Sequence, residues 1–394
     1  MKNLIYMDNA ATTRVKPEVM EAIRPYFEER YANPSSPYTF ASNLSKEVEA
    51  ARKTIADFIG ARENEIYFTG GGSESDNWAL NGLAFSLREK GRHIITSKIE
   101  HHAILHTCEY LEKLGYEITY LDVDENGFVD VGALEAAIRP DTILISVMFA
   151  NNEIGTIEPV KEIGRIAHEH GIIFHTDAVQ AYGHVKIDVN EMNIDLMSVS
   201  GHKIHAPKGI GFLFIRSGIK IESFIHGGGQ ERGKRAGTTN VPGVIGLAKA
   251  TELAADGLEK RVGRETDLRN HLIERIEKEV PHSKLNGDRT ERLPNNVNFC
   301  FRFIEGESLL LLLDKEGICA SSGSACTSGS LDPSHVLLAI GLPHEIAHGS
   351  LRLTLSDETT MEEVDATADA VKRAVERLRA MSPLYEDFAK SNKG

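Results

Sequence analysis

The stretch Ser200-Gly201-His202-Lys203 decides the fold of this chain. An apolar run over 194–199 precedes it, and a segment rich in glycine and apolar residues over 207–213 follows it. This pattern predicts two buried strands joined by a polar turn, which places the Lys203 amine at the rim of a sheet. Because desolvation favours the neutral, nucleophilic amine, Lys203 is a candidate former of a Schiff base. Taken alone, the four residues more often mark a surface turn with a solvated lysine, so the rest of the chain has to decide.

The composition is that of an ordinary globular protein. The chain has 394 residues, of which 41% are hydrophobic and 26% charged, and this length favours about two domains. The formal net charge of −14 disfavours binding to nucleic acid or to an anionic membrane surface. No apolar run is long enough to span a membrane. The acidic residue Asp8 interrupts the N-terminal stretch, which is unlike the apolar region of a signal peptide. We therefore expect a cytoplasmic protein.

The four cysteines do not form a metal-binding pattern. They lie far apart, and none belongs to a Cys-x-x-Cys pair: Cys108, Cys300, Cys319 and Cys326. In a reducing compartment such thiols are either inert core residues or reactive ones. The apolar neighbours of the first three predict packed side chains. We expect no structural zinc site and no resident metal, although Cys326 could hold an iron–sulfur cluster transiently.

Strands and helices alternate through the first ~250 residues, which is typical of a mainly parallel sheet covered by helices. The predicted strands there cover 65–69, 93–96, 142–147 and 172–175. A long helical region over about 244–280 follows, and its lack of clear caps makes it look like a spine between two domains. The remainder combines predicted strands at 296–301 and 350–355 with helices at 308–313 and 361–379. This second pattern suggests a small α+β domain.

Polar residues follow the predicted strands at the edge where α/β proteins bind ligands. Glycines 70–72 and Ser73 stand between a strand and a helix, and their N–H groups and hydroxyl suit a phosphate. Asp177 could keep a pyridinium nitrogen protonated, which makes the ring an electron sink. His101 could stack on a flat ring or move protons, and Asn152 could donate to a ring hydroxyl.

Each of these signals has a plain structural alternative. Glycine turns are more often simply tight turns, Asp177 could equally cap a helix, and a lone histidine or asparagine in such a place is usually structural. Four such strand ends occur in one chain, however, and Lys203 follows Asp177 by 26 positions, 203 − 177. Together they describe a pyridoxal phosphate site.

Eight segments resemble the cysteine desulfurases of the NifS/IscS kind, which are fold-type I enzymes that use pyridoxal phosphate. The segments occur in family order and cover almost the whole chain: Asp8-Asn9-Ala10-Ala11-Thr12-Thr13, Gly72-Ser73-Glu74-Ser75, Glu100-His101, Asn151-Asn152-Glu153-Ile154-Gly155, Thr176-Asp177-Ala178-Val179-Gln180, Ser200-Gly201-His202-Lys203, the stretch 232–238 and the stretch 321–328. The resemblance implies an α/β fold with a mainly parallel seven-stranded sheet flanked by helices. It implies a large domain over 14–257 and a small α+β domain made of 1–13 and 258–394.

Carried over position by position, the resemblance implies a role for each matching residue. Lys203 would bind the cofactor and later move the substrate proton. Asp177 would pair with the ring nitrogen, and His101 would stack on the ring and take part in catalysis. Arg352, beside Asn152, would hold the substrate carboxylate as a bidentate pair. The remaining contacts to the ring oxygen or the phosphate would come from Gly72, Ser73, Asn152, Gln180, Ser200 and His202.

Two features concern the subunit arrangement and the phosphate. The resemblance implies that Thr238 reaches the phosphate in the neighbouring subunit's site, which makes the enzyme a homodimer. Ser73 departs from the family pattern, because many relatives have a threonine there. The hydroxyl is retained, so phosphate binding is still expected.

Cys326 decides which reaction the resemblance implies. It lies in the small, polar segment 321–330, which cannot bury a core and should be mobile. A thiolate on such an arm can attack a substrate sulfur in the pocket and carry it out. The implied reaction converts L-cysteine into L-alanine and leaves a persulfide on Cys326. The persulfide would pass to an Fe–S scaffold protein or to another sulfur acceptor.

Other functions stay open at this point. An aminotransferase or a selenocysteine lyase would share the scaffold, but an aminotransferase has no use for Cys326. A protein that mainly docks Fe–S assembly factors could use the aromatic residues of 382–388, although a tail packed on its own domain is favoured. The sequence leaves four sulfur destinations open, namely general Fe–S assembly, a nitrogenase pathway, tRNA thiolation and thiamin synthesis.

Overall fold

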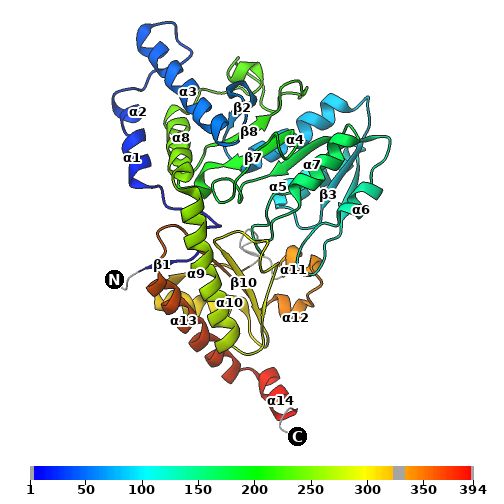
Figure 1. Cartoon of the computed structure of the whole chain (residues 1–394), viewed down its shortest axis with the longest axis vertical. Helices are drawn as coiled ribbons and strands as arrows, with labels where there is room; N and C mark the ends of the chain where they lie inside the picture. The colour runs from blue at the N-terminus through cyan, green and yellow to red at the C-terminus, as the bar shows by residue number, and fades with distance from the viewer. Residues whose placement is uncertain (1–3, 323–332, 392–394) are drawn as a thin grey trace.

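The computed structural model describes residues 4–322 and 333–391, and two main sheets organise them (Figure 1). The larger sheet has seven strands in the order β2-β8-β7-β6-β5-β3-β4. These strands are β2 (Ile66–Thr69), β3 (His93–Ser97), β4 (Glu117–Leu121), β5 (Thr142–Ser146), β6 (Ile173–Asp177), β7 (Leu196–Ser200) and β8 (Gly211–Ile215). Strand β8 pairs antiparallel with β2 and β7, whereas the other four pairings are parallel. The predicted mainly parallel seven-stranded sheet is confirmed.

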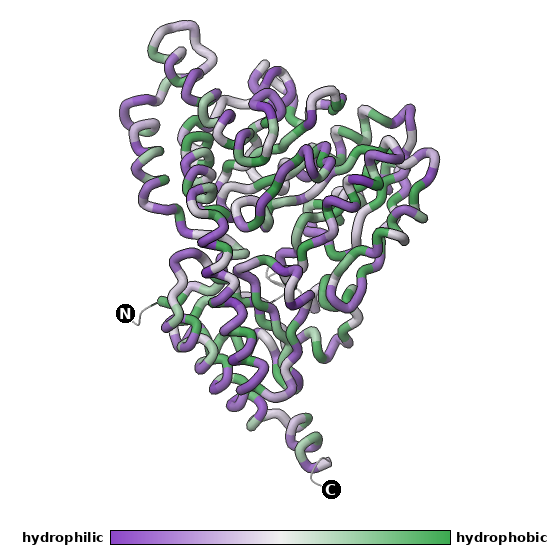
Figure 2. Tube along the Cα trace, viewed as in Figure 1, coloured by the Kyte–Doolittle hydropathy of each residue, from purple (hydrophilic) through white to green (hydrophobic). Residues whose placement is uncertain are grey.

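Helices cover both faces of this sheet, because successive strand side chains point to opposite sides. Phe212 and Phe214 of β8 pack toward one face, and Leu213 between them packs toward the other. Figure 2 shows the resulting hydrophobic strands between the helical layers. The first face is covered by α1 (Pro17–Ile23), α3 (Thr39–Phe58), α7 (Val160–Glu169) and α8 (Val241–Ala255), and the second by α4 (Gly72–Leu87) and α5 (His102–Lys113).

The second sheet lies in the lower part of Figure 1 and is antiparallel, in the order β12-β10-β9. Its strands are β9 (Ser283–Leu285), β10 (Asn296–Phe301) and β12 (Ser350–Thr354), and a separate parallel pair joins β1 (Ile5–Tyr6) to β11 (Ile318–Cys319). The helices of this part are α9 (Leu258–Glu279), α10 (Gly306–Glu316), α11 (His335–Ala339), α12 (His344–Ala347), α13 (Met361–Ala380) and α14 (Pro383–Ser391). The remaining short helices are α2 (Pro25–Glu28) and α6 (Val131–Ala136).

This lower part has a hydrophobic core of its own. Leu272 of α9, Phe299 of β10 and Val371 of α13 are buried together in it. Met7 packs into the same cluster, although it stands near the other end of the chain. This contact supports the proposed grouping of 1–13 with 258–394.

The helical region predicted over 244–280 requires a correction, because it is two helices. It begins earlier, at Val241, where the Asn240 side chain accepts a hydrogen bond from Gly243 N at 3.1 Å and caps α8. It is interrupted between α8 and α9, where Gly257 adopts a left-handed conformation with φ of 63°. No helix within the described ranges is long and apolar enough to cross a membrane.

The aromatic tail forms the short helix α14 and packs on its own chain. The Phe388 ring lies 4.8 Å from the Phe303 ring, and the Arg379 guanidinium lies 5.6 Å from the Tyr385 ring centre. The favoured interpretation of this tail is confirmed. The aromatic contacts remove the observation that suggested a docking role for it.

Candidate active site

A cavity of about 360 Å³ opens at the carboxyl ends of β5, β6 and β7. Parallel strands place their carboxyl ends at one edge of a sheet, so residues far apart in the sequence meet there. Ten of the predicted site residues line this cavity, namely Gly72, Ser73, His101, Asn152, Asp177, Gln180, Ser200, His202, Lys203 and Arg352. Of the other two predicted site residues, Thr238 is not among the lining residues, and Cys326 lies outside the described residues.

Lys203 ends the short 3-10 turn that follows β7 and is half-buried. Its Nζ donates hydrogen bonds to the carbonyl oxygens of Ala10 and Ala11. These carbonyls belong to the segment after β1, so the hydrogen bonds connect the turn after β7 to that segment. Burial and the charge of Lys203 together lower the pKa of both His101 and His202 to about 4. Both imidazoles are therefore neutral near pH 7.

Asp177 is the last residue of β6, and its side chain is buried at the cavity wall. Its Oδ1 accepts a hydrogen bond from Val179 N at 2.9 Å. Burial raises the pKa of Asp177 to about 6, although this N–H and the charge of Lys203 oppose the rise. Asp177 therefore both shapes the turn after β6 and offers a carboxyl group to the cavity. The alternative that it caps a helix is wrong, because the next element after β6 is β7.

The N-terminus of α4 forms another wall. Gly71 precedes the helix with a φ of 146°, a conformation that favours glycine. A Cβ atom on Gly72 would lie 2.7 Å from Cγ2 of Val179, so a larger residue there has to displace Val179 or the start of α4. The first N–H groups of a helix have no partner within the helix and attract anions. This wall, with the hydroxyls of Ser73 and Ser200 beside it, suits a phosphate group.

Arg352 lies on β12 of the second sheet and is 3% exposed. Its Nη1 donates to the carbonyl oxygen of Asn152 at 2.9 Å, and its Nη2 donates to Oδ1 of Asp8 at 3.1 Å. The Nε atom is buried and has no hydrogen-bond partner among the described residues. A buried donor that lines a cavity without a partner suits a carboxylate oxygen of a ligand.

His101 and Gln180 complete the cavity wall. His101 caps α5, because its Nδ1 accepts a hydrogen bond from Ala103 N at 3.1 Å. Because Nδ1 accepts this hydrogen bond, the neutral imidazole of His101 is the tautomer with its proton on Nε2. Gln180 donates from Nε2 to the carbonyl oxygen of Ala10 at 3.1 Å, the same oxygen that accepts a hydrogen bond from the Lys203 amine.

Thr238 and Cys326 stand apart from this arrangement. Thr238 is exposed and does not line the cavity of its own chain. Cys326 and the rest of 323–332 lie outside the described residues, so the predicted cysteine segment is described at Ser321 and Ser322 alone. Ser321 exchanges backbone hydrogen bonds with Arg352, which places the start of that segment beside the cavity.

The other cysteines bear out most of what was expected of them. Cys108 and Cys300 are buried, and burial raises the pKa of the Cys300 thiol to about 11. Neither thiol is therefore ionised near pH 7. Cys319 keeps partial exposure at β11, so it is less tightly packed than predicted.

Sequence reasoning missed Asp76, a buried carboxyl group at this cavity. Asp76 is 1% exposed and lines the cavity beside Asp177. It stands three residues after Ser73, and residues at this spacing share one face of a helix. Helical spacing from the predicted phosphate residues could therefore have found it.

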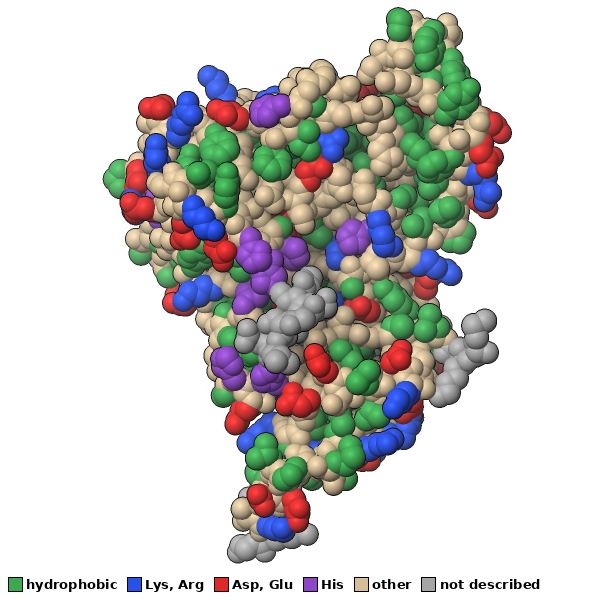
Figure 3. Space-filling model, turned by 180° about the vertical axis from the view of Figure 1, so that it is seen from behind, with side chains coloured by type: hydrophobic (Ala, Val, Ile, Leu, Met, Phe, Trp, Pro, Cys, Tyr) green, Lys and Arg blue, Asp and Glu red, His purple; other side chains and the backbone are tan. Residues whose placement is uncertain are grey.

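A histidine cluster also escaped the sequence analysis. The His102 ring lies 4.9 Å from the His106 ring and 4.7 Å from the His335 ring. Figure 3 shows histidine side chains gathered in the middle of the rear face of the molecule. Within 4–322 and 333–391, no group of three or more histidine, cysteine or acidic side chains is placed to hold a metal ion.

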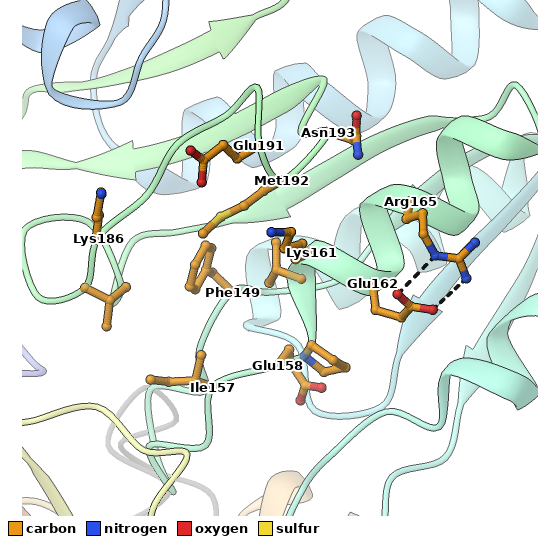
Figure 4. Close-up of a pocket in the computed structure, with 13 residues that line it drawn as sticks. Phe149, Ile157, Glu158, Lys161, Glu162, Arg165, Lys186, Glu191, Met192 and Asn193 are labelled. Carbon is orange, nitrogen blue, oxygen red and sulfur yellow. Dashed lines mark hydrogen bonds and ion pairs between the residues drawn. The ribbon is translucent and has the colours of Figure 1, made fainter.

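A larger cavity of about 630 Å³ lies elsewhere, between α7 and the loop after Val185 (Figure 4). Phe149 and Met192 form much of its apolar wall. Glu162 and Arg165 pair with each other at 2.6 Å beside it. None of the predicted site residues lines it, so its size does not make it the reactive site.

The fold and these side chains define a pyridoxal phosphate enzyme of fold type I. A family model described as aminotransferase class-V matches residues 5–367. The chain is 56% identical over 393 residues to a cysteine desulfurase IscS of Clostridium botulinum strain Hall, with 99% of each chain covered. It is 60% identical over 380 residues to a cysteine desulfurase IscS of Methanosarcina thermophila, covering 96% of this chain and 94% of that one.

Solved structures agree with these relatives. A NifS-like protein matches with a TM-score of 0.89 and 37% identity, covering 95% of this chain and 99% of that one. SspA in complex with cysteine matches with a TM-score of 0.80 and 39% identity, covering 90% and 99%. The chain therefore belongs to the aminotransferase class-V family and, within it, to the cysteine desulfurases.

The cavity fits the cofactor that this family uses. The α4 N-terminus at Gly72 suits the phosphate, Asp177 suits the ring nitrogen and Lys203 supplies the amine. The unpaired Nε of Arg352 suits the carboxylate of an amino acid bound next to the ring. Buried polar atoms without partners are rare in proteins, so this one supports a ligand at this place.

The Gly72→Ala substitution tests the placement of the phosphate. The added Cβ collides with Val179 and displaces the α4 N-terminus, so we expect pyridoxal phosphate to bind roughly tenfold more weakly. The dissociation constant is measured by following absorbance as the cofactor is added to cofactor-free protein. Ser73→Thr keeps the hydroxyl and is the control, with the same affinity expected. Unchanged binding by Gly72→Ala would contradict this placement.

Proposed function

We propose that this protein, a cysteine desulfurase, removes sulfur from L-cysteine, releases L-alanine and holds the sulfur as a persulfide on Cys326. The observation that carries the proposal is the convergence of Lys203, Asp177 and Arg352 on one cavity. So placed, the amine can bind the cofactor, and the carboxyl group can pair with the ring nitrogen of the cofactor. The guanidinium can hold the carboxylate of an amino acid.

Arg352 fixes the orientation of the substrate. Its guanidinium is buried and is already held by Asp8 and by the backbone of Asn152, so it does not have to be ordered when a ligand binds. Arg352 lines the cavity, so a carboxylate bound there forms a charge-assisted pair with its guanidinium. Arg352 thereby fixes the carboxylate end of the substrate at the β12 side of the cavity.

Pyridoxal phosphate, when bound, supplies an electron sink that makes the Cα–H bond and then the C–S bond of cysteine breakable. Lys203 binds it and afterwards moves the proton of Cα, because its amine is the basic group at the end of β7. The Asp177 carboxylate stabilises a positive charge on the ring nitrogen of the cofactor. His101, neutral with its proton on Nε2, forms the adjacent wall.

Cys326 completes the reaction. Its thiolate attacks the substrate sulfur, an S–S bond forms, and the C–S bond breaks with its electron pair left on carbon. A proton then completes the methyl group of L-alanine. The persulfide passes to an Fe–S scaffold protein or to another acceptor, and we propose that this transfer takes place in the cytoplasm.

A second copy of the chain completes the proposed enzyme. Thr238 is exposed in its own chain, as a residue that serves the neighbouring site would be. Phe27, Tyr31 and Phe40 are also exposed, with Phe27 at 66% and Tyr31 at 72%. Figure 3 shows hydrophobic side chains over α2 and α3 at the upper right. Large exposed aromatic side chains favour an interface, which supports a homodimer.

Replacing Cys326 tests the proposed reaction. The Cys326→Ser protein should form L-alanine from L-cysteine at least about a hundredfold more slowly, because a hydroxyl does not supply the thiolate nucleophile. Its cofactor absorbance should match that of the unchanged protein. Cys319→Ser replaces another partly exposed cysteine and should retain full activity. Full alanine formation by Cys326→Ser would contradict the proposal and favour a lyase that acts without this thiol.

Co-expression of two inactive variants tests the role of Thr238. Lys203→Ala removes the reactive amine, and Thr238→Asp places a negative charge against the phosphate. If Thr238 serves the neighbouring site, a mixed dimer contains one intact site, so co-expression restores about a quarter of the unchanged activity. If Thr238 serves its own site, or no site, the mixture stays as inactive as its components or Thr238→Asp is active alone. Either result would exclude the proposed exchange.

A further inference from the structure

Asp76 is a buried carboxyl group that the reaction described above does not use. It lies on α4, one turn beyond the proposed phosphate residues, and lines the cavity with Asp177. Its side chain is 1% exposed, and its Oδ1 has no hydrogen-bond partner among the described residues. Such a group has to be explained, because an unsatisfied buried carboxylate is costly.

A chain of hydrogen bonds leads away from Asp76. The Ser198 hydroxyl bonds to Asp76 and lies 2.9 Å from Nε2 of His175. His175 bonds through Nδ1 to the Ser146 hydroxyl, also at 2.9 Å. Ser146, His175 and Ser198 are fully buried and come from three neighbouring strands, β5, β6 and β7, respectively. The four groups therefore form one continuous network behind the cavity.

His175 does not neutralise Asp76. Its Nε2 lies 3.8 Å from Oδ1 of Asp76, which would suit an ion pair if the ring were charged. Burial lowers the pKa of His175 to about 3, and both ring nitrogens already bond to hydroxyl groups. The imidazole is therefore neutral and acts as a link in the network.

The acidic groups around Asp76 oppose its ionisation. Burial raises the pKa of Asp76 well above its usual range, and the charge of Asp177 on β6 raises it further. Glu100 after β3 is the third acidic group near it, and burial raises the pKa of Glu100 to about 8. Two buried carboxyl groups that share one site do not both ionise. Asp177 has the Val179 N–H and the charge of Lys203 to stabilise its ionised form, whereas Asp76 has a single hydroxyl.

We propose that Asp76 is a positioning residue that carries a proton, so that Asp177 alone presents a negative charge to the ring nitrogen. The proton on Asp76 then orders the network in one direction. Asp76 donates to Ser198, Ser198 donates to Nε2 of His175, and Nδ1 of His175 donates to Ser146. Asp76, Ser198 and His175 then each donate once, and the Ser146 hydroxyl accepts the last bond. The proposal rests on the cofactor site proposed above and deepens it.

Two substitutions at Asp76 and one elsewhere separate this role from simple packing. Asp76→Asn keeps a neutral group that can donate to Ser198. Asp76→Leu keeps the approximate shape but leaves Ser198 and His175 without that partner. Glu100→Gln is the matched control, because Glu100 is a buried carboxyl group whose pKa is raised to about 8 by burial, yet it does not line the cavity.

Infrared spectra of the cofactor-loaded enzymes report the protonated carboxyl groups directly. We expect Asp76→Asn to remove one carboxylic acid band and Glu100→Gln to remove a different one. Absorbance titration should give a pyridoxal phosphate dissociation constant within about twofold of the unchanged value for Asp76→Asn, and about tenfold weaker for Asp76→Leu. The absorption spectrum of the bound cofactor should be unchanged in Asp76→Asn.

Two results would overturn the proposal. One is an Asp76→Asn spectrum that keeps every carboxylic acid band, which would show that Asp76 is ionised. The other is a changed cofactor spectrum or a tenfold weaker affinity in Asp76→Asn, which would show that its negative charge is needed. Neither readout depends on L-cysteine or on Cys326, so failure here is distinguishable from failure of the proposed reaction.

Discussion

The parallel pairing of β6 with β7 is the constraint on which the site depends. It places Asp177 opposite Ser198 at the same edge of the sheet, and the turn after β7 then carries Lys203 over that edge. Lys203 follows Ser198 by five residues, so a register shift in this pairing would move the amine away from the carboxyl group. The relative position of the two groups is thus set by backbone hydrogen bonds, which are much stiffer than long side chains.

The antiparallel strand β8 serves the other end of the cavity. It pairs Gly211 with Thr69, the last residue of β2, where the chain turns into α4. A Cβ on Gly211 would lie 2.3 Å from the Val199 carbonyl oxygen and 2.8 Å from Cα of Gly71. A glycine on β8 therefore lets the phosphate turn pack directly on the end of β7. The small sheet adds Arg352, and the segment after β1 closes the cavity through its hydrogen bonds to Thr354 and Lys203.

Much of the fold and most of the site could be predicted from the sequence. Asp177 and Lys203 follow strongly apolar strands, so their place at the sheet edge follows from hydrophobic patterning alone. Arg352 lies inside a strand of the second sheet, and only the resemblance to a family pointed to it. The break at Gly257 was missed because the flanking sequences are both helical, and one glycine in a left-handed conformation separates them.

Residues whose role depends on buried surroundings were harder to predict. Asp76 lies within a helix, where an acidic residue is usually a solvated surface group, and its burial depends on strands that come much later in the chain. His102, His106 and His335 come together because α11 packs near the start of α5, a contact that local spacing does not encode. Roles that need a second subunit or the residues 323–332 rest on the family resemblance.

The most direct test of this account is chemical trapping of the amine that binds the cofactor. Borohydride reduction of the cofactor-loaded enzyme fixes pyridoxal phosphate to that amine, and proteolysis followed by mass spectrometry locates it. The account predicts a single modified residue, Lys203, with the label lost in Lys203→Ala. A label on any other lysine, or undiminished labelling of Lys203→Ala, would contradict it.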